Sequence, residues 1–164
     1  MSDDRVSATR RIAASASDIF RIISDPTMHV EIDGSHMLVT APNPKPLQAV
    51  GDSFVMDMDR DALGDLPLGK YTVLNVVTKI SPDSLLEWNV GSVEGGALGH
   101  VYGYELAPVG ERETDVTSYC DWSGLDWSLI PEELRDRLTF PIVPKMALIT
   151  TLEKLDRVAT QPAT

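Results

Sequence analysis

Residues 143–159 read VPKMALITTLEKLDRVA, and this stretch decides the fold. Its apolar side chains recur every three or four residues, as at Leu148, Leu152 and Leu155, while charged residues occupy positions between them. This spacing places the apolar residues on one face of an α-helix. The stretch therefore predicts one long amphipathic helix near the C-terminus, whose apolar face must pack on another layer of the protein.

Upstream of that helix, apolar and polar residues alternate with a period of two, which is the pattern of half-buried β-strands. Short turns separate the later segments, so we expect consecutive strands to pair antiparallel. The predicted strands are residues 5–13, 36–41, 53–58, 70–80, 85–90, 101–106 and 114–122.

Two short helices are predicted after the first strand. Ser15 followed by Asp18 resembles a capping box, and the apolar helical stripe behind it ends before Pro26, which predicts a helix over about 16–24. A further helical turn is predicted within residues 28–34. The order of elements is that of an α+β domain, a sheet of about six to seven strands with a long helix packed on it.

The composition limits the classes of partner. The chain has 164 residues, with 14 Lys or Arg against 25 Asp or Glu, which gives a formal net charge of −11. Such a surface repels phosphate backbones and anionic lipids, so we expect neither nucleic acid nor a membrane surface as a partner. The length predicts one domain over residues 1–164, ordered from about 5 to 159, with one sizeable core.

The N-terminal residues and the cysteine usage predict a cytoplasmic protein without a stable membrane anchor. Residues 1–11 carry charges and no apolar run that would serve as a secretory signal. No stretch approaches the roughly 18 apolar residues of a membrane-spanning helix. Cys120 is the only cysteine, which fits a reducing compartment and a small buried side chain.

Several short motifs resemble a known superfamily. They are Ile12-Ala13-Ala14, Ile19-Phe20, the run from Ile22 to Pro26, Leu86-Glu87-Trp88 and Tyr104-Glu105-Leu106. Together with the order of strands and the terminal helix, they resemble the START-like polyketide cyclase/dehydrase and lipid-transport superfamily (SRPBCC). The resemblance implies a helix-grip fold, in which a curved antiparallel sheet wraps around the C-terminal helix and leaves an apolar cavity. It also implies that the protein carries or transforms a lipophilic molecule.

Candidate ligand contacts follow from the large side chains that share the inward faces of the strands and the apolar face of the helix. On the strand from 70 to 80, the residues assigned to the inward face are Leu74, Val76 and Ile80. The same pattern would also fill a solid core, so both interpretations stay open. The predicted ligand contacts are Phe54, Met56, Leu74, Trp88, Tyr102, Tyr104, Trp122, Trp127, Leu148 and Leu152.

Three residues are candidates for a catalytic role, namely His100, Tyr102 and Tyr104. Tyr102 and Tyr104 share an inward face, and buried phenols need hydrogen-bond partners, which a ligand or the protein supplies. His100 has the same parity and is a candidate general base, although a histidine at a strand end beside a glycine-rich loop favours a solvated position. No nucleophile elbow appears, and Cys120 has no evident histidine partner, so covalent catalysis is not expected.

No metal and no cofactor are predicted. Asp57, Asp59 and Asp61 resemble the opening of a calcium loop, but Ala62 replaces the turn glycine and Leu68 replaces the bidentate glutamate. The three histidines lack the close spacing of a transition-metal site. The glycine-rich run over 91–99 lacks the signature of a phosphate loop or a dinucleotide site.

The segment Trp122–Ile130 is unusually apolar for a connection. It fits a lid over the core, a gate to a cavity, or a contact in a homodimer.

The sequence and the resemblance together leave three possible functions. The favoured one is a carrier or sequestering protein for a small lipophilic ligand. The second is a polyketide cyclase/aromatase-like lyase without metal or covalent nucleophile. The third is an interaction module that uses this segment.

Overall fold

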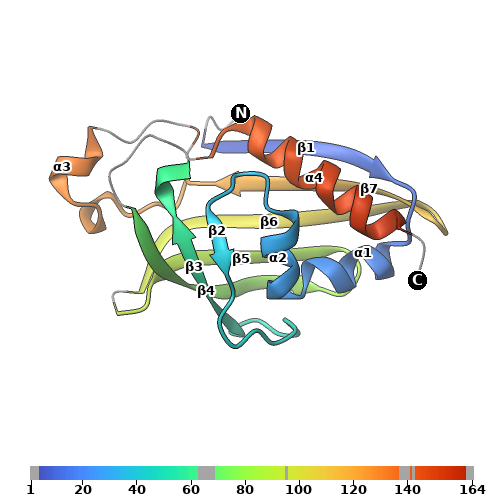
Figure 1. Ribbon diagram of the computed structural model, residues 1–164, viewed down its shortest axis with the longest axis horizontal. Coiled ribbons are helices and arrows are strands. Elements are labelled where there is room, and N and C mark those ends of the chain that lie inside the picture. The colour runs from blue at the N-terminus through green and yellow to red at the C-terminus, as the bar shows by residue number, and fades with distance from the viewer. Residues whose placement is uncertain (1–3, 63–68, 95, 137–140, 142, 162–164) are drawn as a thin grey trace.

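A seven-stranded antiparallel sheet curls into a half-barrel, and the C-terminal helix lies across its concave face (Figure 1). The computed structural model describes residues 4–62, 69–94, 96–136, 141 and 143–161. The strands are β1 (Arg5–Ile12), β2 (Leu38–Thr40), β3 (Ser53–Asp59), β4 (Lys70–Ser81), β5 (Leu85–Ser92), β6 (Gly96–Gly110) and β7 (Glu113–Asp121). The helices are α1 (Ala16–Ile23), α2 (Pro26–Ile32), α3 (Glu132–Arg135) and α4 (Lys145–Thr160), with 3₁₀ turns η1 (Arg60–Ala62) and η2 (Trp127–Leu129).

The strand order is β1-β7-β6-β5-β4-β3-β2, so the chain runs as a meander from β2 to β7 and β1 closes the sheet beside β7. The predicted antiparallel sheet of six to seven strands around a long C-terminal helix is confirmed. Lys145 is the first residue of α4, because Pro144 disfavours a helical conformation for Val143 and occupies the N-cap position, where its side chain makes no capping hydrogen bond. The sequence predicts order only to about residue 159, and residues 162–164 lie outside the described residues.

The first of the two short helices begins where the sequence predicts. The Ser15 side chain accepts a hydrogen bond from the backbone N–H of Asp18 at 3.1 Å and caps α1. Asp25 caps α2 by accepting from the Thr27 N–H, and Pro26 occupies the first turn, where its missing donor costs nothing. The second helix thus begins two residues before the predicted start at Met28.

One strand faces the opposite way to the prediction. Val73, Asn75 and Val77 of β4 are buried, whereas Leu74 is half-buried on the convex face, so the inward assignment of Leu74 and Val76 is wrong. The strand has apolar residues at both parities, which leaves its face undetermined by alternation alone. A register irregularity after Val77 then turns Ile80 inward, where it pairs with the buried Leu86.

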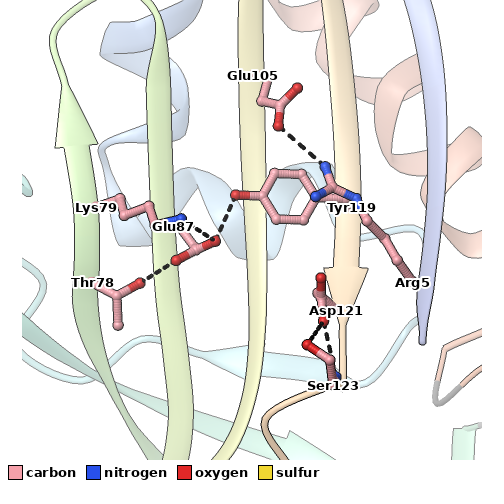
Figure 2. A network of polar contacts seen from close by, with 8 residues as sticks. All are labelled: Arg5, Thr78, Lys79, Glu87, Glu105, Tyr119, Asp121 and Ser123. Atoms are coloured by element: carbon pink, nitrogen blue, oxygen red, sulfur yellow. Dashed lines mark hydrogen bonds and ion pairs between the residues drawn. The ribbon is translucent and has the colours of Figure 1, made fainter. Parts of the chain in front are cut away.

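A polar network on the convex face ties neighbouring strands together (Figure 2). The buried Glu87 carboxylate accepts hydrogen bonds from the Tyr119 hydroxyl at 2.9 Å and from the Thr78 hydroxyl at 2.7 Å. Arg5 lies over the Tyr119 ring, 3.9 Å from its centroid. The ring crosses Gly103, where any Cβ would collide with it. These contacts join strands β1, β4, β5, β6 and β7.

Candidate functional site

A cavity of about 530 Å³ lies between the concave face of the sheet and helices α2 and α4. Its wall is largely apolar, and residues 125 and 129–131 border it as well. Six of the ten predicted ligand contacts line it: Phe54, Met56, Trp88, Tyr102, Tyr104 and Leu148. Contact of these residues with a ligand stays a prediction, whereas the space for one is present in the structure.

The other four predicted contacts lie elsewhere. Leu74 lies on the convex face for the reason given above. Leu152 is one turn beyond Leu148 in α4 and is buried in the core. Trp122 is buried after β7, where its backbone N–H donates to the carbonyl of Asp4. Trp127 belongs to η2 and is 44% exposed. The cavity wall does not include these four residues.

Trp88 is the centre of an aromatic surface inside the cavity. Its ring centroid lies 4.9 Å from that of His29 and 5.9 Å from that of Phe54. Tyr104 lies 6.0 Å away, and Tyr102 stacks nearly parallel at 6.3 Å. Antiparallel pairing creates this group, because Trp88 is directly opposite Tyr102 across β5 and β6. The cavity therefore offers flat apolar surfaces to an occupant.

Both predicted tyrosines are neutral phenols. Burial raises the pKa of Tyr104, and the nearby Asp33 carboxylate raises it further. Burial also raises the pKa of Tyr102, which shares a hydrogen bond with Cys120. Among the described residues nothing bonds the Tyr104 hydroxyl, so this phenol is available to a ligand. Each phenol is suited to donating a hydrogen bond and not to accepting a proton as a base.

His100 is buried, so the expectation of a solvated strand-end residue is wrong. Strand β6 begins at Gly96, four residues before His100, and carries the imidazole ring into the cavity wall. The centroid of this ring lies 5.9 Å from that of the Tyr102 ring. Burial lowers the pKa of His100 to about 4, and the positive charge of Arg60 lowers it as well. The ring is therefore neutral near pH 7. Its Nδ1 is buried without a hydrogen-bond partner in the described part of the chain.

Sequence reasoning did not assign two further polar groups of the wall, His29 and Arg60. His29 lies on the buried face of α2, and its Nε2 is 2.6 Å from the carbonyl oxygen of Ile23. The pKa of His29 is lowered, mainly because the ring is buried. The spacing of three between Pro26, His29 and Ile32 is the signal that would have found it. Arg60 is buried at the start of η1, a position without a comparable periodic signal.

The acidic residues of β3 are engaged in hydrogen bonds. The Asp57 carboxylate accepts from the hydroxyls of Thr40 and Thr72, and the Asp59 carboxylate accepts from the backbone N–H of Asp61. Leu68, which entered the calcium-loop comparison, lies outside the described residues. Within the described ranges no three His, Cys, Asp or Glu residues are placed to hold a metal ion.

The segment Trp122–Ile130 divides into buried and exposed parts. Leu125 is buried and lines the cavity together with Ile130. The backbone at Gly124 contacts Gly99, where a Cβ would collide with the Gly124 carbonyl. Leu129 also borders the cavity although it is 47% exposed. The segment thus forms one end of the cavity wall and presents apolar side chains outward.

Solved structures share this architecture. A protein from Chromobacterium violaceum, CV1439, superposes with a TM-score of 0.63 at 14% identity over 98% of this chain and 100% of its own. Truncated norcoclaurine synthase from Thalictrum flavum gives a TM-score of 0.60 at 15% identity over 97% and 94% of the two chains. The fold is the helix-grip fold. Identities this low establish the fold and no activity.

Two uncharacterised mycobacterial proteins match part of this sequence. The uncharacterised protein Rv0088 of Mycobacterium tuberculosis is 31% identical over 118 residues, which cover 72% of this chain and 47% of that protein. The chain therefore spans about half the length of the curated relatives it matches. No family model matches the sequence.

Among the described residues, none of the helices has the length and apolar character needed to cross a membrane.

Proposed function

We propose that this protein binds a small lipophilic molecule between the curved sheet and α4, as a carrier or sequestering protein of the START-like superfamily. The supporting observation is the apolar, aromatic-lined cavity of about 530 Å³, which lies within the range typical of small-molecule sites. Burial of apolar ligand surface against Trp88 and Phe54 supplies the binding free energy. The single cysteine, buried and unpaired, supports a cytoplasmic location.

Fluorescence titration with N-phenyl-1-naphthylamine, a neutral apolar dye, tests this proposal. We expect saturable enhancement with one dye per chain. Val90→Trp places a large ring in the cavity wall and should abolish most of the enhancement. Val76→Trp is the matched control, because Val76 is half-buried on the neighbouring strand and does not line the cavity. Failure of the dye to bind the folded protein, or equal binding by both variants, would contradict the proposal.

Catalysis in the same cavity is the second candidate, as a polyketide cyclase/aromatase-like lyase. The observation that favours it is that the neutral, buried His100 lines the same cavity as the phenols of Tyr102 and Tyr104, where these groups can hydrogen-bond and orient a reacting substrate. A poly-β-ketone offered to the protein should then cyclise, and His100→Gln should slow the reaction at least tenfold. Unchanged turnover after replacement of His100, Tyr102 and Tyr104 together would exclude this function.

Self-association is a separate proposal that rests on the outward side of Trp122–Ile130. Trp127 and Leu129 are large apolar residues that are almost half exposed. Sedimentation velocity should show a concentration-dependent homodimer that Trp127→Ser weakens. A monomer at all concentrations would contradict the homodimer.

A further inference from the structure

We propose that His29 selects the ligand: its Nδ1 presents a fixed hydrogen-bond acceptor to the cavity and favours aromatic ligands that carry an O–H or N–H donor. This inference rests on the proposed function and names the chemical class of ligand. A phenol or aryl amine fits this requirement, whereas an aryl ether or ketone of the same shape does not.

The hydrogen bond to the backbone determines the position of the ring proton. His29 Nε2 is 2.6 Å from the carbonyl oxygen of Ile23, and a carbonyl oxygen has no hydrogen to donate. Nε2 must therefore carry the proton and donate. In a neutral imidazole the second nitrogen is then an unprotonated acceptor, so the Ile23 carbonyl fixes the tautomer.

The surroundings keep the ring neutral. His29 is only 5% exposed, and this burial lowers its pKa despite the carboxylates of Asp25 and Asp33, which act in the opposite direction. The Asp33 carboxylate already accepts hydrogen bonds from the Ser35 N–H and hydroxyl and from the Leu38 N–H. It is thus held by the chain and does not bond the His29 ring.

The acceptor nitrogen belongs to a ring in the cavity wall. His29 lines the cavity, and no described residue hydrogen-bonds its Nδ1. His100 Nδ1 is the only buried side-chain nitrogen or oxygen in the described ranges that lacks a partner, so His29 Nδ1 retains accessible surface. The ring lies between Trp88, 4.9 Å away, and Phe54, whose ring meets it edge-on at 5.3 Å.

These contacts explain why His29 Nδ1 discriminates between ligands that carry a hydrogen-bond donor and ligands that carry only an acceptor. A flat ligand against Trp88 lies beside His29, where its donor can meet the Nδ1 lone pair. An acceptor at the same place would face that lone pair in a largely apolar wall. A buried polar group left unpaired in this way typically lowers affinity by about tenfold or more.

Paired ligands test the inference in the unmodified protein. We expect 2-naphthol to bind about tenfold or more tightly than 2-methoxynaphthalene by isothermal titration calorimetry. His29→Phe keeps an aromatic ring in the cavity wall but removes the ring acceptor, and should lose the preference while still binding the ether. His36→Phe is the matched control, because His36 is exposed and lies outside the cavity wall; it should keep the preference.

Nitrogen-15 NMR of the histidine rings gives a second readout that needs no variant. We expect His29 Nδ1 to be unprotonated in the free protein and its resonance to shift with 2-naphthol but not with 2-methoxynaphthalene. A protonated Nδ1, equal affinities for the two ligands, or a preference that survives in His29→Phe would overturn the inference and leave the cavity intact. If neither ligand binds, the proposed function itself fails.

Discussion

Replacement of His100 by Phe should remove part of the acid sensitivity of the protein. The folded state keeps the imidazole neutral, with a pKa of about 4, whereas the unfolded chain takes up a proton near the ordinary value of 6.5. The unfolded state thus binds more protons between these two values, so the free energy of unfolding falls as the pH falls through this window. Below about pH 4 the loss is complete, because both states are then protonated.

The size of the effect follows from the same two pKa values. Each unit of difference corresponds to about 1.36 kcal/mol, so acidification from neutral pH to about pH 4 costs the unmodified protein on the order of 3 kcal/mol through His100. His100→Phe should lack this loss. His29, which has a lowered pKa for the same reason, contributes in both proteins and cancels in the comparison.

Urea unfolding followed by tryptophan fluorescence, repeated across this pH range, measures the difference. The free energy of unfolding of His100→Phe relative to the unmodified protein should rise by roughly 3 kcal/mol from neutral pH to about pH 4. Parallel pH curves for the two proteins would refute the reasoning, since they would mean that His100 titrates alike in the folded and unfolded states.

Three further substitutions test the packing by the same urea assay. Gly99→Ala should cost roughly 2 kcal/mol or more, because φ is +113° and the new Cβ would collide with the Gly124 carbonyl; unchanged stability would contradict this close approach. Glu87→Gln should cost about 2 kcal/mol by weakening the hydrogen bond from the Tyr119 hydroxyl, yet leave dye affinity unchanged because the Glu87 side chain does not line the cavity; loss of dye binding would contradict that separation. Leu152→Ala should cost about 2–5 kcal/mol, since the side chain is 1% exposed, and a smaller effect would argue against a tight core there.

Local patterns in the sequence predict most of the fold. The helical stripe of residues 143–159 predicts α4, and the Ser15 cap predicts the start of α1. Alternation predicts the strands because one face of each strand is buried and the other is not. It fails in β4, where Val73 and Leu74 are both apolar and an irregularity after Val77 changes the parity.

The candidate site is harder to predict because it depends on contacts between distant segments. Trp88, Tyr102 and Tyr104 follow from strand parity, and six of ten predicted contacts line the cavity. The role of His29 depends on a hydrogen bond to Ile23, in the preceding helix, which no spacing rule contains. Alternation indicates a strand only from residue 101 and therefore places His100 in solvent, whereas β6 begins at Gly96 and carries His100 into the cavity wall.

Methionine methyl NMR tests the central claim, that the cavity holds a small lipophilic molecule, most directly. Met56 and Met58 line the cavity, whereas Met146 is 66% exposed at the start of α4 and serves as an internal control. With bound N-phenyl-1-naphthylamine, we predict nuclear Overhauser effects from the dye to the methyl groups of Met56 and Met58 and none to that of Met146. Effects on Met146 alone would place the dye on the surface and contradict a ligand-binding cavity.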